Sequence, residues 1–206
     1  MIWSVIKLFI DIIITVQKLI LASQSAQRKI ILETTGLTFE VVPADIDEQG
    51  ITAKTELERA KVIALAKAKK VLATNPNSVV MAADTYTVVN DRAYEKPATK
   101  AEAKQMLLEQ SGKKGVCLTG FAYLDPANSI EFGQTAVTDI EFRELLEEEI
   151  DNYVKNNPVT TWSAGFCPAY PAGLALISQI NGSNTGFSHG LPMEMLIPLL
   201  QKSKLL

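Results

Sequence analysis

The sequence predicts a mixed α/β fold, and three observations lead to that prediction. Short apolar runs alternate with segments of helical period in the first half of the chain, and two consecutive strand-like segments follow later. Of the 206 residues, 47% are hydrophobic and 21% are charged, which is typical of globular proteins and excludes a disordered chain. A chain of this length buries roughly 70% of its unfolded surface, so its core needs no disulfide or zinc ion. We expect one domain over residues 18–206, preceded by an apolar extension over residues 1–17.

The individual elements follow from these runs in chain order. Apolar runs predict strands at residues 18–22, 38–42, 79–83, 116–124, 135–142 and 174–180. Segments of helical period predict helices at residues 26–35, 55–73, 99–111, 144–156 and from Pro192 onward. Thr99 and Glu102 form a capping box, and Pro198 is expected to bend or end the last helix. Residues 86–90 either continue the strand at 79–83 or turn back.

The first eighteen residues are strongly apolar, with polar residues at helical intervals: Ser4, Lys7, Asp11, Thr15 and Lys18. A membrane span is disfavoured because Lys7 and Asp11 would each cost about 2.5–3.5 kcal/mol near mid-membrane. A secretory signal is disfavoured because no basic region precedes the apolar run. Three interpretations stay open: a helix packed on the body or on a partner, a segment in contact with a membrane, or a translation start that in fact lies near Val16.

Charge and cysteine usage exclude several classes of function. The formal net charge is −3, which argues against nucleic acid as a partner. Cys117 and Cys167 form no CxxC motif, and His189 is the single histidine, so common zinc sites are excluded and a reducing, cytoplasmic location is expected. A G-x-S-x-G elbow and a Walker A loop are both absent. We expect core positions for the cysteines and no catalytic role for His189.

An anion site is predicted where the first strand meets the first helix. Ser23 or Ser25 can cap the helix, and Arg28 and Lys29 fall in its first turn, where the helix dipole disfavours cations by about 0.3–1 kcal/mol each. Backbone N–H groups, hydroxyls and a guanidinium that converge on a helix N-terminus favour a phosphate. The alternative is a helix cap with two solvated cations.

Two groups of carboxylates are candidates for a metal or for activating water. Asp84 follows the apolar strand at 79–83, at the edge where α/β sheets place catalytic groups. The loop of Asp45, Asp47 and Glu48 could hold Mg²⁺ or Mn²⁺ beside a phosphate chain. The alternatives are an aspartate that ends a strand in a turn and a solvated acidic loop.

Lysines on the long helix and in the following loop could bind an anion. Lys67 has apolar neighbours on its helical face and therefore needs an anion or a route to water. Lys69 has a similar setting, so periodicity does not choose between the two. Lys96 precedes Pro97, which restricts its backbone to extended values. Solvated lysines are the alternative for all three.

Taken in order, the motifs resemble those of the Maf family of nucleoside triphosphate pyrophosphatases, which are related to Ham1. The family pattern L-x-L-A-S-x-S-P-R-R is matched by LILASQSAQR at residues 19–28, and its L-A-x-x-K-A by ALAKA at 64–68. The acidic loop is matched by DIDE at residues 45–48, and D-T-V-V by DTYTVV at 84–89. K-P, L-S-G, T-G, A-G and G-L-P follow at residues 96–97, 110–112, 119–120, 164–165 and 190–192.

This resemblance implies an elongated mixed sheet flanked by helices, with a cleft between two lobes. It implies hydrolysis of the bond between the α- and β-phosphates of a nucleoside triphosphate and a divalent cation (Mg²⁺, Mn²⁺ or Co²⁺). Members of the family are often homodimers. Asp84 would be the proton acceptor and would hold the metal with Glu48. The residues that would clamp the triphosphate are Ser23, Arg28, Lys67 and Lys96. The role would be to clear non-standard or excess nucleotides; the alternative is a catalytically weak nucleotide-binding regulator of septum formation.

The chain departs from the family pattern at positions that the resemblance links to base choice. Gln27 replaces the arginine of the dTTP/UTP group and the tryptophan of the 7-methyl-GTP group. A second such position falls at Tyr170, which could stack on a base or fill space, whereas the third, Thr85, is retained. The histidine that follows S-G in the dTTP/UTP group is absent, which leans toward the 7-methyl-GTP group or a divergent branch. The preferred base therefore stays open.

Overall fold

In residues 17–206, the part of the chain that this computed structural model describes, seven strands form one mixed sheet flanked by helices. The strands are β1 (Leu19–Leu21), β2 (Glu40–Val41), β3 (Val79–Val89), β4 (Arg92–Tyr94), β5 (Lys114–Asp125), β6 (Ile130–Phe142) and β7 (Ile177–Gly182). β1 is parallel to β2 and β3, and the other pairings are antiparallel. The order is β2-β1-β3-β5-β6-β7, with β4 paired to β3. The predicted fold class is confirmed.

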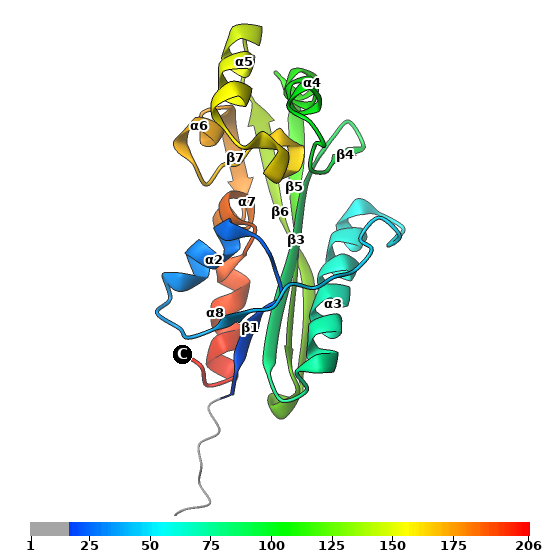
Figure 1. Ribbon diagram of the computed structural model, residues 1–206, viewed down its shortest axis with the longest axis vertical. Coiled ribbons are helices and arrows are strands. Elements are labelled where there is room, and N and C mark those ends of the chain that lie inside the picture. The colour runs from blue at the N-terminus through cyan, green and yellow to red at the C-terminus, as the bar shows by residue number, and fades with distance from the viewer. Residues whose placement is uncertain (1–16) are drawn as a thin grey trace, which may run out of the picture.

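The molecule is elongated because β3, β5 and β6 run through most of its length (Figure 1). The helices are α2 (Ala26–Glu33), α3 (Glu56–Thr74), α4 (Lys100–Gln110), α5 (Glu147–Asn156), α6 (Pro171–Leu174), α7 (Asn184–His189) and α8 (Met193–Lys202). One lobe carries α3 on one face of the sheet and α2 with α8 on the other, and the second lobe carries α4, α5 and α6. The first turn of α2 and the end of α7 lie where the two lobes meet.

The long helix α3 approaches the sheet closely where β5 carries a glycine. Ala64 and Ala68 of α3 are buried against Ala82 of β3 and Ala122 of β5. A Cβ on Gly120 would lie 1.9 Å from the carbonyl oxygen of Ala60, so only glycine permits this approach. The T-G motif therefore fixes the position of α3 over the centre of β3.

The predicted helix caps are present. The hydroxyl of Thr99 accepts a hydrogen bond from the amide of Glu102, and the carboxylate of Glu102 reaches back to the amide of Ala98, at 3.1 and 2.7 Å. Ser25, not Ser23, caps α2 by accepting from the amide of Arg28 at 3.4 Å. These caps satisfy backbone donors that would otherwise lack a partner at the start of each helix.

Several sequence expectations were wrong in detail. Asp84 does not end a strand, because β3 continues to Val89 and pairs with β5 from Val80 to Val88. Of the two alternatives for Pro198, an end of the helix is excluded, because α8 continues to Lys202 and burial of Leu199 and Leu200 offsets the lost hydrogen bond. The strand expected at 174–180 is shifted to Ile177–Gly182, because Pro171 opens the short helix α6.

Other elements were missed or shortened. The strand β4 was not predicted, and neither was helix α7 at residues 184–189. The helix expected at 144–156 begins at Glu147. The interpretations of residues 1–16 lie outside the described residues. Gln17 donates a hydrogen bond to Asp125 at 2.6 Å. No helix within residues 17–206 is long and apolar enough to cross a membrane.

Candidate active site

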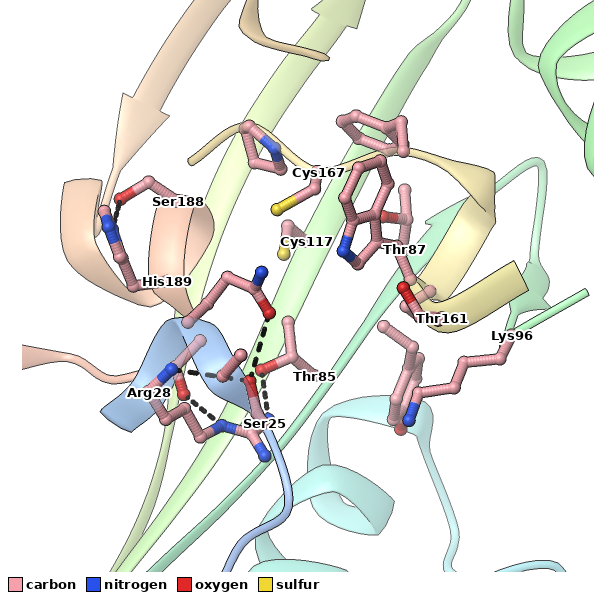
Figure 2. A pocket seen from close by; sticks show the side chains of 18 of the residues that line it. Ser25, Arg28, Thr85, Thr87, Lys96, Cys117, Thr161, Cys167, Ser188 and His189 are labelled. Carbon is pink, nitrogen blue, oxygen red and sulfur yellow. Dashed lines mark hydrogen bonds between the residues drawn. The ribbon is translucent and has the colours of Figure 1, made fainter. Parts of the chain in front are cut away.

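A cavity of about 640 Å³ opens where the two lobes meet. Side chains from β3, α2, α3, α7 and the segment 158–170 line it (Figure 2). The predicted site residues that line it are Gln27, Arg28, Glu48, Lys67, Asp84, Thr85, Lys96 and Tyr170. Ser23 is not among the lining residues, but it is buried and contacts Arg28. Residues that span 143 positions of the chain thus meet around one cavity.

Three hydrogen bonds fix the guanidinium of Arg28. Its Nε donates to the carbonyl oxygen of Gly190 at 2.8 Å, Nη1 donates to Ser23 Oγ at 2.9 Å, and Nη2 donates to Thr85 Oγ1 at 3.1 Å. Burial lowers the pKa of Arg28, while the charges of Asp84 and Glu48 oppose that shift. An arginine side chain has five N–H donors, so two remain for a ligand in the cavity.

The neighbours of Arg28 are themselves fixed. Thr85 Oγ1 lies 3.2 Å from Thr119 Oγ1, and Thr119 donates to the carbonyl oxygen of Gly186 at 2.8 Å. Gly190 adopts a φ of +67°, and a Cβ there would lie 2.9 Å from Thr85 Oγ1. The glycine of the G-L-P motif therefore allows its carbonyl to reach Arg28. Lys29, by contrast, is solvated and pairs with Glu33 on the surface at 3.7 Å.

Lys67 joins two carboxylates at the wall of the cavity. Its Nζ lies 2.8 Å from Glu48 Oε2 and 2.9 Å from Asp84 Oδ1. Only 10% of the Lys67 side chain is exposed, compared with 57% for Lys69, which pairs with Glu131 outside the cavity. The structure thus separates the two lysines that periodicity left equivalent.

The acidic residues in the cavity are suited to a cation that is bound together with a phosphate chain. Glu48 and Asp84 converge on the same side, whereas Asp47 turns away and accepts a hydrogen bond from the amide of Gly50 at 3.2 Å. Within residues 17–206, His, Cys, Asp and Glu form no group of three or more that could hold a metal ion. Mg²⁺ commonly binds one or two carboxylates and takes its other ligands from phosphates and water. The two carboxylates fit that mode.

Lys96 enters the cavity from the second lobe. It lies in the segment between β4 and α4, is exposed, and points toward the cavity in Figure 2. Pro97, which is buried, holds the backbone at this point. Cations from both lobes therefore face the same space.

The opposite part of the cavity wall is aromatic, and of its rings only Tyr170 was expected from the sequence. The rings of Trp162 and Tyr170 pack with centroids 5.5 Å apart, and Phe166 packs on Phe187 at 6.3 Å. Gln27 Nε2 donates to the Tyr170 hydroxyl at 3.3 Å, which links α2 to the second lobe. Trp162, Phe166 and Tyr170 flank short turns and Phe187 lies in the six-residue helix α7, so no long periodic pattern marked these residues as neighbours.

Both cysteines line the cavity and are buried. Burial raises the pKa of Cys117 to about 12, so its thiol is neutral at ordinary pH. A neutral buried thiol is a poor nucleophile, in keeping with the expected core role.

Comparisons with known proteins agree with the motifs. The sequence model of the family described as "Maf-like protein" matches residues 18–203. The dTTP/UTP pyrophosphatase of Syntrophus aciditrophicus is 31% identical over 185 residues, covering 90% of this chain and 89% of that one. The enzyme of the same name from Ruminiclostridium cellulolyticum is 33% identical over 187 residues, covering 90% and 96%. Among solved structures, a HAM1 protein from Coxiella burnetii superposes with a TM-score of 0.49 at 19% identity, covering 90% of this chain and 99% of that one.

Proposed function

The chain belongs to the Maf family, and from this premise we propose that it is a nucleoside triphosphate pyrophosphatase, which hydrolyses the bond between the α- and β-phosphates to release a nucleoside monophosphate and diphosphate. One observation carries the proposal most directly: Arg28, Lys67, Lys96 and Asp84 line the same cavity. The match from residue 18 also supports the proposal that residues 18–206 form one Maf-like domain.

Three cations meet the charge requirement of phosphoryl transfer. In such reactions the enzyme acts mainly by positioning the phosphates and by stabilising the charge on their non-bridging oxygens. Arg28 offers its two remaining N–H donors, and Lys67 and Lys96 offer ammonium groups from opposite lobes. Ser23 acts through Arg28, because its hydroxyl holds the guanidinium rather than lining the cavity.

Asp84 is the proposed proton acceptor for the attacking water. It projects from the middle of β3, and Lys67 fixes one of its carboxylate oxygens at 2.9 Å. A carboxylate held this way can orient a water molecule and accept its proton, for which the usual contribution is about 10²–10⁴-fold in rate. Its place on a long paired strand keeps that orientation rigid.

Glu48 and Asp84 are the residues that would hold the divalent cation implied by the family. When bound, such a cation neutralises charge on the phosphates. Without it, Lys67 compensates both carboxylates through its two ion pairs.

The proposed specificity residues are Gln27, Thr85 and Tyr170. Gln27 and Tyr170 hydrogen-bond each other at the cavity rim, and Tyr170 packs on Trp162, so both are placed to contact a base. Thr85 acts by holding Arg28. The names of the relatives favour a pyrimidine triphosphate over 7-methyl-GTP, although Gln27 departs from both family patterns.

A panel of nucleotides tests the proposal. The purified protein is incubated with dTTP, UTP, CTP, GTP, ATP or 7-methyl-GTP and with Mg²⁺, Mn²⁺ or Co²⁺, and diphosphate release is measured. We expect turnover of at least one pyrimidine triphosphate with diphosphate as product. Binding without turnover across the panel would contradict the proposal and favour a nucleotide-binding regulator.

A further inference from the structure

The single histidine of the chain, for which no catalytic role was expected, lies in the wall of the cavity. His189 is the last residue of α7, directly before Gly190, whose carbonyl holds Arg28. In Figure 2, His189 and Lys96 lie on opposite sides of the cavity. The imidazole therefore lies on the wall opposite this cation.

The hydrogen bonds around Ser188 determine which ring nitrogen of His189 carries the proton. Ser188 Oγ lies 2.8 Å from the carbonyl oxygen of Asn184 and 2.8 Å from His189 Nδ1. A carbonyl oxygen can only accept, so the one hydroxyl proton is donated to Asn184. Nδ1 must then donate to Ser188 Oγ, which leaves Nε2 with a free lone pair. Within residues 17–206, Nε2 makes no hydrogen bond.

Because Nε2 has a free lone pair, it can bind only a ligand group that donates a hydrogen bond. Burial lowers the pKa of His189, so the ring is neutral at pH 7. Phosphate oxygens carry lone pairs and no proton to donate at this pH, so a neutral acceptor cannot bind them. The hydrogen-bond donors of a nucleoside triphosphate are the N–H groups of the base and the hydroxyls of the sugar.

We infer that His189 is a specificity-determining residue whose Nε2 accepts a hydrogen bond from a donor on the nucleoside part of the substrate. This inference rests on the proposed function and deepens it by assigning a direction to the bound nucleotide. The triphosphate lies toward Lys67, Asp84 and Lys96, and the nucleoside lies toward α7 and the aromatic wall.

Nuclear magnetic resonance tests the tautomer without reference to activity. Because the chain has one histidine, an untagged ¹⁵N-labelled sample gives one pair of imidazole nitrogen signals. We expect a protonated Nδ1 and an unprotonated Nε2 in the free protein, and a shift of the Nε2 signal when a non-hydrolysable α,β-methylene analogue of UTP binds. A protonated Nε2, or an Nε2 signal unchanged at saturation with the analogue, would overturn the inference. The matched variant Ser188→Ala removes the partner of Nδ1 and should yield a mixture of tautomers.

Two substitutions at His189 distinguish the loss of the hydrogen-bond acceptor from the loss of the ring shape. His189→Leu removes the acceptor and should raise KM about tenfold with little change in kcat, which corresponds to one hydrogen bond. His189→Gln keeps an acceptor oxygen near the position of Nε2 and should retain most of the affinity. Circular dichroism and thermal melting establish that each variant is folded.

Inorganic triphosphate is the control ligand, because it lacks the nucleoside. His189→Leu should bind it as tightly as the unchanged protein does. An equal loss of affinity for UTP and for inorganic triphosphate would overturn the inference, since it would indicate a general disturbance of the anion site. Because binding is measured directly, this result is independent of whether any nucleotide is hydrolysed.

Analogues that each lack one donor identify the group that His189 binds. N3-methyl-UTP removes the imide N–H of the base, and 2′-deoxy and 3′-deoxy analogues each remove one sugar hydroxyl. The loss of affinity caused by His189→Leu should vanish for the analogue that lacks the relevant donor. A loss of affinity that persists for all three analogues would overturn the inference.

Discussion

The two ends of the cavity are built in different ways. At the charged end, Arg28 makes three hydrogen bonds and Lys67 makes two ion pairs, and 13% of the Asp84 side chain is exposed. At the aromatic end, Tyr170 is 41% exposed and its hydroxyl has one long hydrogen bond, to Gln27. Asp84 stands on a long strand and Arg28 and Lys67 stand on helices, whereas Trp162 and Tyr170 flank short 3₁₀ and helical turns. The residues proposed for the chemistry are thus held by regular elements, whereas those proposed for base choice lie on short segments that can vary without disturbing the sheet.

The largest effect is expected for Asp84→Asn. The amide keeps the shape of the side chain but cannot accept the proton of water, so turnover should fall by about 10²–10⁴-fold. Nucleotide affinity should be retained, because the cations are untouched. Diphosphate release measures the first quantity and calorimetric titration with the α,β-methylene analogue measures the second. Turnover close to that of the unchanged protein would refute the role of Asp84.

The next largest effect on turnover and stability is expected when the Lys67 ammonium group between the two carboxylates is removed. Lys67→Met leaves Asp84 and Glu48 without their shared partner and should lower the free energy of unfolding by about 1–3 kcal/mol, in addition to reducing turnover. Lys69→Met is the matched control two residues away, where an exposed pair with Glu131 is worth about 0.2–1 kcal/mol. Urea unfolding compares the two. An equal loss of unfolding free energy in both variants would contradict the view that Lys67 stabilises the charged end through its two ion pairs.

Arg28→Lys tests whether the forked shape of the side chain matters at the charged end. Lysine keeps the charge but cannot hold Gly190, Ser23 and Thr85 together, so KM should rise about tenfold. Lys29→Gln, on the exposed side of the same helix, is the control and should leave KM unchanged. Equal KM values for Arg28→Lys and Lys29→Gln would contradict the role given to the forked guanidinium of Arg28.

The smallest effect is expected at the aromatic end. Tyr170→Ala removes a ring that could stack on a base, and because the ring is exposed we expect the lower end of the stacking range, about 1 kcal/mol. The ratio of kcat/KM between UTP and 7-methyl-GTP should change, while affinity for inorganic triphosphate should not. A uniform loss for all nucleotides and for inorganic triphosphate would mean that Tyr170 supports the fold rather than the choice of base.

The sequence predicted the charged end well because its residues lie in compact motifs at predictable elements. Arg28 follows a capped helix start, and Lys67 shows the apolar neighbours of a buried helix face. The choice between Lys67 and Lys69 required the sheet, because only the packing of α3 over Gly120 decides which lysine turns inward. The sequence marked Asp84 as a candidate because it is a carboxylate that follows an apolar run. Its position in the middle of β3 depends on the pairing of β3 with β5.

The aromatic end could not be predicted in the same way. Trp162 follows a three-residue 3₁₀ turn and Tyr170 precedes a four-residue helix, so no period reveals a shared face. The hydrogen bond between Gln27 and Tyr170 joins residues 143 positions apart. No catalytic role was expected for His189 because it is the single histidine, and its cavity position depends on the packing of α7 against β5 and β6.

The central claim is that Asp84 directs water to the phosphorus nearest the sugar while the cations hold the triphosphate. Hydrolysis of UTP in ¹⁸O-labelled water, followed by ³¹P nuclear magnetic resonance and mass spectrometry, tests it most directly. We predict uridine monophosphate that carries the ¹⁸O label, unlabelled diphosphate, and loss of both products in the Asp84→Asn variant. Label in the diphosphate, or formation of uridine diphosphate and phosphate, would contradict the account.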